Sequence, residues 1–281
     1  MAQRLVDAGH KVAVFDINPD AMNHFSKSAF LCSSPEDAAN RAEVVVGCLQ
    51  TVAQYYDAFL GPNGAINGKR FKTYIHVGTT GRECVQKLEA GLSERGVRFL
   101  DAPVTGGAAG AVAGTLAVMA SGDRAIFDAV QPFLSSYARK SVYLGSEPGQ
   151  AQVMKLVNNM LSATNLAAAC EVMVVGAKAG LSVDAMLEVI NNGSGQNNAT
   201  ATKIPDNIVP RGLQFGSSLN NVFKDLGFYQ AEAKAAGIDS DIYKTVVGCY
   251  KNAASQGTAE DDIVTVVRPF ERAAGVELKR R

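Results

Sequence analysis

The amino-acid sequence predicts an α/β protein in which a doubly wound parallel sheet is followed by an all-helical domain. Two observations lead to this fold class: short apolar runs alternate with helix-start signals in the first half, and strand signals cease after residue 149. The chain has 281 residues, of which 47% are hydrophobic and 19% charged. This length favours two domains of about 150 residues each, and the composition is that of a folded globular protein.

The first half contains six predicted strands separated by helices. The chain opens on the back end of a helix over 1–10, and helix starts follow at Asn18-Pro19 and Ser34-Pro35. Further helices are expected over 81–94 and 124–134. The predicted strands are short and apolar, at 11–16, 43–49, 74–77, 97–101, 115–119 and 141–144.

The second half is predicted to be helical throughout. Residues 150–179 contain no proline and are rich in Ala, Leu, Met and Val, so they would form one helix about 45 Å long. Glycine, asparagine or proline residues separate the helices that follow, at 183–191, 219–235, 242–253 and 261–274. We therefore expect one domain over 1–147 and a second, helical domain over 148–281.

Charge and cysteine content exclude several classes of protein. Lys plus Arg at 27 balance Asp plus Glu at 27, so the chain has no net charge with which to attract nucleic acid or an anionic membrane. The five cysteines are scattered and form no C-x-x-C pair, which argues against a disulfide framework or a structural metal and favours a reducing compartment. Polar residues interrupt the apolar stretches before the roughly 20 residues that a membrane span needs. We expect no nucleic-acid, membrane or metal partner.

An acidic residue, Asp16, ends the first predicted strand. Ligands of doubly wound sheets bind outside the carboxyl ends of the strands. In a dinucleotide-binding fold, an acid at this place accepts hydrogen bonds from a ribose 2′-hydroxyl and repels the 2′-phosphate of NADP. Asp16 could equally cap the helix that starts near Pro19. The glycine fingerprint G-x-G-x-x-G, expected about 20 residues earlier, does not occur in this sequence.

A glycine-rich segment, DAPVTGG from Asp101 to Gly107, follows the strand over 97–101. The Thr105 hydroxyl and the backbone N–H groups of Gly106 and Gly107 could hold an anion such as a carboxylate. A simple turn between two strands is the alternative, and composition alone favours it.

The long helix begins with a polar stripe. Its members lie at i, i+3, i+4 and i+7 in an otherwise apolar helix: Lys155, Asn158, Asn159 and Ser162. If the stripe is buried, desolvation would lower the pKa of Lys155 towards values useful in proton transfer. The stripe could equally be the solvent-exposed face. A later Lys224-Asp225 pair, taken alone, has the pattern of a surface ion pair.

Together these segments resemble the β-hydroxyacid dehydrogenases, the family that contains 3-hydroxyisobutyrate dehydrogenase and tartronate semialdehyde reductase. The resemblance covers nearly all of the chain. Residues 1–10 resemble the end of the family's dinucleotide signature, and DAPVTGG matches D-x-P-V-S-G-G with Thr105 in place of the serine. GQAQVMKLVNN over 149–159 matches G-x-G-x-x-x-K-x-x-x-N, and KDLG over 224–227 matches the family's K-D-L-G element. The four motifs occur in the family's order.

The resemblance implies an NAD-dependent oxidoreductase with a Rossmann-type domain. It would interconvert a short β-hydroxy acid and the corresponding aldehyde or ketone by hydride transfer, with Lys155 as catalytic acid and base. The implied substrate-binding residues are Thr105, Gly106, Gly107 and Asn159. The implied cofactor-binding residues are Asp16, Leu49, Gln50, Thr79 and Lys224, the last of which would close over the nicotinamide and the substrate. NAD is expected rather than NADP because of Asp16.

The sequence departs from the family pattern at several positions. Ala151 replaces the second glycine of G-x-G-x-x-x-K. His76 and Gly78 stand where relatives often have Asp and Ser, which puts contacts to the nicotinamide ribose in doubt. Gln196 stands where relatives often have arginine, which argues against a strongly anionic substrate.

Two alternatives to a hydroxy-acid dehydrogenase remain at this point. Imine reductases share the architecture but usually lack a lysine at the position of Lys155. A catalytically silent nucleotide-binding or scaffold protein of the same fold is the other, because the sequence lacks the first strand and its glycine loop.

Three further expectations concern the state of the protein. We expect Met1 to be an internal methionine of a longer chain, since no first strand precedes it. The long apolar helix predicts a homodimer or homotetramer. The expected compartment is the cytoplasm, or the mitochondrial matrix if a targeting peptide precedes Met1.

Overall fold

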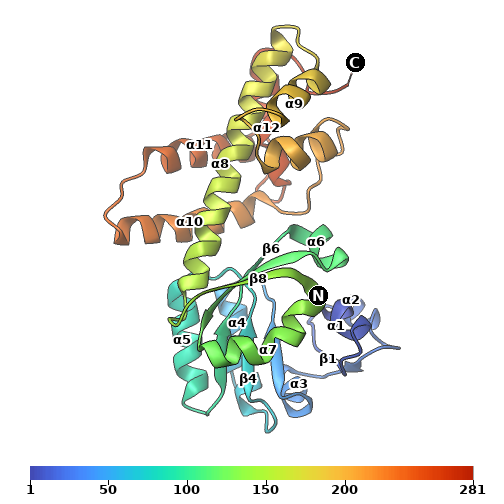
Figure 1. Cartoon of the computed structure of the whole chain (residues 1–281), viewed down its shortest axis with the longest axis vertical. Helices are drawn as coiled ribbons and strands as arrows, with labels where there is room; N and C mark the ends of the chain where they lie inside the picture. Colours follow the sequence, from blue (N-terminus) through green and yellow to red (C-terminus); the bar gives the residue numbers. More distant parts are fainter. Residues whose placement is uncertain (281) are drawn as a thin grey trace. The chain divides into compact units, whose positions relative to one another are not determined.

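The computed structural model describes residues 1–280 and divides into two compact units, Met1–Lys155 and Leu156–Arg281 (Figure 1). The division falls within the first two turns of the long helix, slightly after the predicted boundary between 147 and 148. Each unit has its own hydrophobic core, with two clusters in the first and one in the second.

The first unit is built on a six-stranded sheet with the strand order β3-β4-β5-β7-β6, and with β8 beside β7. Its strands are β3 (Val44–Gly47), β4 (Thr73–His76), β5 (Arg98–Asp101), β6 (Val104–Thr105), β7 (Leu116–Gly122) and β8 (Ala138–Gly145). The pairs β3-β4, β4-β5 and β7-β8 are parallel, whereas β5-β7 and β6-β7 are antiparallel. The predicted α/β fold class is confirmed, but the antiparallel pairs are a departure from an all-parallel sheet. The chain turns back through β6 and the short helix α6 (Gly107–Ala113) between β5 and β7, and no long crossover separates these strands.

Helices cover both faces of this sheet, as the near-continuous apolar strands predicted. Side chains alternate between the faces: on β4, Ile75 belongs to the core cluster shared with α7 (Arg124–Tyr137), whereas Tyr74 packs with α4 (Val52–Leu60) and α5 (Arg82–Ser93). All four residues of β4 are buried, so the strand is held from both sides.

A separate two-stranded parallel sheet joins β1 (Ala13–Val14) to β2 (Phe30–Leu31). Only two residues of the predicted strand over 11–16 form this ladder. β2 was not predicted, because its two residues are exposed and give no apolar burial pattern.

The helix starts in the first unit follow local capping chemistry. Asn18 accepts a hydrogen bond from the Asp20 N–H and begins α2 (Pro19–Asn23), and Ser34 accepts one from the Asp37 N–H and begins α3 (Pro35–Arg41). Both predicted starts are confirmed. The other short elements are α1 (Ala2–Asp7) and a 3₁₀ turn, η1 (Ala65–Asn67).

The second unit is all helical, as predicted. It contains most of α8 (Gln150–Lys178), followed by α9 (Val183–Asn191), η2 (Ala199–Ile208), α10 (Leu219–Ala235), α11 (Asp241–Ser255), η3 (Ile263–Val266) and α12 (Val267–Ala274). η2 is a π-helix with Pro205 inside it, and it was not predicted. Proline lacks the N–H that an α-helix needs, and the wider π-type turns accommodate such a break.

Helix α8 passes the length and composition test for a membrane span, with a mean hydropathy of 1.5 over its most apolar window. Half of that window is buried inside the protein, as in a core helix of a folded domain. The polar residues in this segment were the reason for predicting no membrane span from the sequence.

Candidate active site

The side chain of Tyr55 holds the loop that follows β3. Its hydroxyl group accepts a hydrogen bond from the Leu49 N–H (2.8 Å) and donates one to the Gly47 carbonyl (3.3 Å). Burial raises the pKa of Tyr55, so the phenol stays neutral. The predicted cofactor residue Leu49 is thus half-buried and held by its backbone at the carboxyl end of β3.

Gln50 continues this loop and is exposed. The backbone N–H groups of Gln50 and Thr51 both donate to the Gln54 side-chain carbonyl, at 3.1 and 3.0 Å, while Thr51 caps α4. The loop backbone is therefore fixed, and the Gln50 side chain points to solvent-accessible space.

His76, at the end of β4, is fully buried. One ring nitrogen lies 3.0 Å from the Tyr74 hydroxyl and the other 2.9 Å from the Thr80 hydroxyl. Desolvation lowers the pKa of His76 to about 3, so the ring is neutral at physiological pH. His76 is a core residue and presents no surface to a ligand, so its side chain offers no contact to a nicotinamide ribose.

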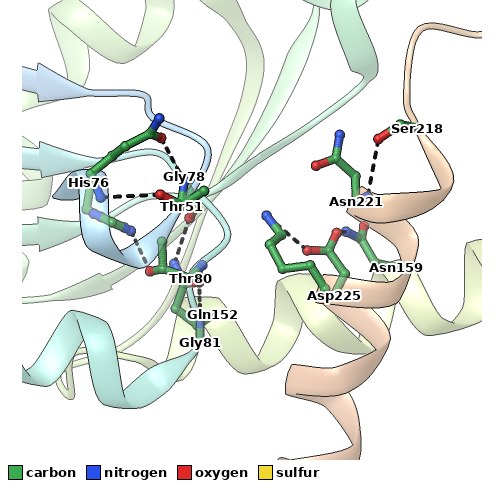
Figure 2. Close-up of polar contacts among 12 residues, drawn as sticks. Thr51, His76, Gly78, Thr80, Gly81, Gln152, Asn159, Ser218, Asn221 and Asp225 are labelled. Carbon is green, nitrogen blue, oxygen red and sulfur yellow. Dashed lines mark hydrogen bonds and ion pairs between the residues drawn. The ribbon is translucent and has the colours of Figure 1, made fainter. Parts of the chain in front are cut away.

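The loop of residues 78–81 is clamped by Gln152, from the first turn of α8 (Figure 2). The Gln152 carbonyl accepts hydrogen bonds from the N–H groups of Thr80 (3.0 Å) and Gly81 (3.2 Å), and its amide donates to the Gly78 carbonyl (3.0 Å). Thr79 lies between these anchored residues. It is the only residue of 73–81 that is not buried, so it forms the accessible point of the loop.

Asp101 lies beneath Gln152 and connects it to the sheet. Its carboxylate accepts from the Gln152 amide (2.7 Å), the Gln152 and Gly149 N–H groups (3.1 and 3.2 Å) and the Ser121 hydroxyl (3.4 Å). Complete burial raises the pKa of Asp101 to about 7, although the donors around the carboxylate favour its charged form. Asp101 therefore caps the start of α8 from another element.

The substrate residues predicted in DAPVTGG lie at the end of β6. Thr105 is half-buried, and Gly106 and Gly107 are exposed. Both glycines have positive φ, of 125° and 67°, a backbone conformation that is disfavoured for residues with a side chain. The segment is more than a simple turn, because it pairs with β7 before it reverses.

Lys155 lies one turn after Gln152 on α8 and is half-buried. The polar stripe on this helix is not its most exposed face, since Met154, Val157 and Leu161 are more exposed than the stripe residues. The stripe is therefore neither fully buried nor the solvated face that the sequence left as an alternative.

In the second unit, Asp225 joins two predicted site residues. The Asn159 amide donates to one carboxylate oxygen of Asp225 (Figure 2), at a distance of 2.6 Å. The Lys224 ammonium lies 3.4 Å from the other oxygen. The Asn158 side-chain amide donates to the side-chain oxygen Oδ1 of Asn159 (3.2 Å). From the sequence, Asp225 was expected only as the partner of Lys224 in a surface ion pair, although its place in K-D-L-G was a signal.

Asp16 is exposed at the end of β1, and one of its oxygens accepts a hydrogen bond from the Asn18 N–H (2.8 Å). Asn18, not Asp16, caps α2. The helix-cap alternative for Asp16 is therefore wrong. Gln152 and Tyr55 are functional candidates that the sequence analysis missed. A glutamine inside the G-x-G-x-x-x-K motif was the available signal for Gln152.

Comparison with known proteins assigns both halves of the chain to protein families. Residues 1–145 match the NAD binding domain of 6-phosphogluconate dehydrogenase, and residues 149–270 match the family described as NAD-binding of NADP-dependent 3-hydroxyisobutyrate dehydrogenase.

Individual relatives cover almost the whole chain. The NAD-dependent L-serine dehydrogenase of Pseudomonas aeruginosa is 30% identical over 98% of this chain and 95% of its own. The L-threonate dehydrogenase of Haemophilus influenzae is 29% identical over 98% and 91%. The crystal structure of 3-hydroxyisobutyrate dehydrogenase from Salmonella typhimurium matches with a TM-score of 0.85 and 26% identity, over 95% of this chain and 94% of that one.

Proposed function

The chain belongs to the β-hydroxyacid dehydrogenase family, the NAD(P)-dependent dehydrogenases of hydroxy acids, and we propose that Lys155 is the general acid and base of its reaction. The observation that carries this proposal is the place of Lys155 on α8. The first turn of this helix is hydrogen-bonded to the sheet and to the 78–81 loop, so the lysine is held on a rigid element and not on a mobile loop.

In the proposed reaction, the Lys155 amine takes the proton of the substrate hydroxyl group during oxidation and returns it during reduction. The nicotinamide, when bound, accepts or supplies the hydride at the same carbon. Lys155 must be neutral to accept the proton and protonated to return it.

We propose that the substrate carboxylate binds at Thr105, Gly106 and Gly107. The Thr105 hydroxyl and the two consecutive glycine N–H groups are donors, and the glycine pair is accessible. Asn159 and Lys224 remain the proposed contacts from the second unit, with Lys224 closing over the nicotinamide. Asp225 supports this role because it holds the Asn159 amide by a hydrogen bond and the Lys224 ammonium by an ion pair.

We propose two sets of contacts to the dinucleotide, one at its adenine ribose and one along the carboxyl ends of the strands. Asp16 is an exposed acceptor for an adenine ribose hydroxyl, and it disfavours the 2′-phosphate of NADP. Leu49, Gln50 and Thr79 lie in the loops after β3 and β4, at the sheet edge where such ligands bind. We therefore propose NAD as the preferred cofactor.

The proposed substrate is a short β-hydroxy acid. The relatives are named for L-serine, L-threonate and 3-hydroxyisobutyrate, each a small hydroxy acid. Gln196 carries no charge, which favours substrates with a single carboxylate.

We also propose that the enzyme is a cytoplasmic homodimer or homotetramer. Four exposed apolar residues lie within about 60° of one another around α8: Val157, Leu161, Val172 and Val175, which are between 44% and 64% exposed. Such a stripe is the kind of surface that a second copy covers. The unpaired thiols of all five cysteines support a reducing compartment. Sedimentation of a Val175→Glu variant tests the assembly, and an unchanged oligomer would argue against this stripe as the interface.

The Lys155→Ala variant tests the proposed mechanism. We expect kcat to fall by about two to four orders of magnitude, because acid-base catalysis is lost, while NADH binding is retained. NADH formation is measured with L-serine, L-threonate and 3-hydroxyisobutyrate. Binding is followed by NADH fluorescence, which no tryptophan obscures in this chain. A Lys155→Ala enzyme with wild-type kcat would exclude the lysine as acid and base.

A further inference from the structure

The Gln152 side chain uses its full hydrogen-bonding capacity inside the protein. A glutamine amide offers two donors and two acceptor sites. In Gln152 the donors face the Gly78 carbonyl and the Asp101 carboxylate, and the acceptor faces the N–H groups of Thr80 and Gly81. These partners also fix which atom is oxygen and which is nitrogen, because the opposite assignment would set donors against donors.

The clamp links three segments that are far apart in the sequence. Asp101 ends β5, residues 78–81 follow β4, and Gln152 belongs to the first turn of α8. The Asp101 carboxylate also accepts the N–H groups of Gly149 and Gln152, so it fixes both the position and the rotation of the helix start. Gln152 and Asp101 are both fully buried, which strengthens these hydrogen bonds and makes an unmatched partner costly.

We propose that Gln152 and Asp101 are positioning residues that hold Lys155 and Thr79 in register for the reaction. This inference rests on the proposed role of Lys155. Lys155 follows Gln152 by three residues, so a small rotation of the helix start moves the lysine directly. Thr79 is the one accessible residue of a loop whose backbone is clamped at Gly78, Thr80 and Gly81. The Gln152 side chain therefore fixes the positions of both Lys155 and Thr79, the loop residue proposed to border the cofactor.

A cycle of three variants tests this proposal. Gln152→Glu sets two carboxylates against each other, and Asp101→Asn sets an amide N–H₂ against the Gln152 N–H₂. The double variant Asp101→Asn/Gln152→Glu restores a donor-acceptor pair with the original net charge and keeps the bonds to Thr80 and Gly81. The bond to the Gly78 carbonyl is lost, and a carboxylate oxygen faces that carbonyl instead, as it also does in Gln152→Glu. Gln150→Leu is the control, because Gln150 begins the same helix and bonds only locally, to the Glu147 N–H.

We expect each single variant to lower kcat by about 10- to 100-fold, the scale of a small misplacement of a catalytic group. The double variant should recover at least about tenfold of that loss, because contacting residues couple on this scale. Gln150→Leu should keep the wild-type kcat. Rates are expressed per NADH-binding site, counted by fluorescence titration, so that partial unfolding does not imitate a catalytic defect.

The outcomes separate this inference from the proposed function. If Lys155→Ala loses turnover while Gln152→Glu and Asp101→Asn retain the wild-type kcat per site, the positioning role is wrong and the lysine mechanism stands. If the single variants lose only thermal stability and NADH sites, the clamp is structural and the inference is overturned. If Lys155→Ala keeps the wild-type kcat, the proposed function itself fails.

Discussion

Gly78 and Tyr55 are packed so closely that a β-carbon on residue 78 would overlap the Tyr55 hydroxyl group. The same hydroxyl group bonds to Leu49 and Gly47, so the ends of β3 and β4 share one fixed point. The glycine is therefore a consequence of the buried tyrosine, which is itself fully enclosed and cannot withdraw without loss of packing.

We expect Gly78→Ala to destabilise the protein by about 1–3 kcal/mol, the usual cost of overpacking, and to weaken NADH binding because both loops shift. Urea unfolding followed by circular dichroism and NADH titration measure the two effects. Gly248→Ala is the matched control. Gly248 lies on α11 with no atom near the added β-carbon, so that variant should gain about 0.5–1 kcal/mol. Equal stability of the two variants would contradict the steric argument.

The neutral, buried His76 should make the protein acid-sensitive. Its folded-state pKa is about 3, below the usual 6.5. The unfolded chain therefore binds more protons between these values, and the contribution of His76 to stability is lost as the pH falls through this window. At about 1.4 kcal/mol per pH unit, the loss at pH 4 is on the order of 3 kcal/mol. Asp101 has the opposite effect on stability. Its folded-state pKa is raised to about 7, so below this pH the folded protein binds more protons than the unfolded chain, and the contribution of Asp101 to stability increases as the pH falls.

His76→Gln removes the histidine contribution and leaves that of Asp101. The difference in unfolding free energy between wild type and His76→Gln should shrink, and then reverse or vanish, as the pH is lowered from 7.5 to 4. Urea unfolding at four pH values measures this difference. Parallel stability curves for the two proteins would mean that His76 does not titrate in this window.

The elements predicted best from the sequence are those with local signals. Asn18 and Ser34 predict helix starts because a capping side-chain oxygen and a following proline both act within one turn. The strand β3 could be predicted because its apolar run is also a local signal. The π-helix around Pro205 was not visible, because a proline signals a break without specifying which wider turn absorbs it.

Motifs read along the chain are the basis on which Thr105, Lys155 and Lys224 are proposed as site residues. Contacts between residues that are distant in the sequence could not be predicted. The bond from Gln152 to Asp101 joins residues 51 positions apart, and no spacing rule encodes it. The antiparallel pairing of β5 with β7 could not be predicted either, because the local sequence of a strand does not specify which strand pairs with it.

Asp16 should set the cofactor preference. We expect Asp16→Asn to lower the ratio of NAD to NADP catalytic efficiency by about tenfold or more, because the charge that repels a 2′-phosphate is removed. Asparagine keeps an oxygen for the Asn18 N–H, so the local turn is preserved. Initial rates with each cofactor at several concentrations give the ratio. An unchanged ratio would remove Asp16 from the cofactor site.

Lys203 is a buried cation without an ion-pair partner among residues 1–280. Its ammonium group donates to the Ser162 hydroxyl (2.7 Å) and lies 5.1 Å from the Phe215 ring centroid. Desolvation lowers its pKa, although Cys170 and Asp262 oppose the shift. The folded state therefore binds fewer protons than the unfolded chain below the ordinary lysine pKa, and stability should rise as the pH approaches that value.

Lys203→Met should accordingly be neutral or stabilising at pH 7, since an apolar side chain of similar length replaces a poorly compensated charge. The advantage over the wild type should shrink as the pH is raised from 7 towards about 10.4, where the unfolded-state lysine also becomes neutral. Thermal unfolding at pH 7, 8.5 and 10 measures this trend. Lys251→Met, at an exposed position of α11, is the control and should change little at any pH. If Lys203→Met is instead destabilised by more than about 2 kcal/mol at pH 7, the hydrogen bond to Ser162 and the ring contact outweigh the desolvation of the ammonium.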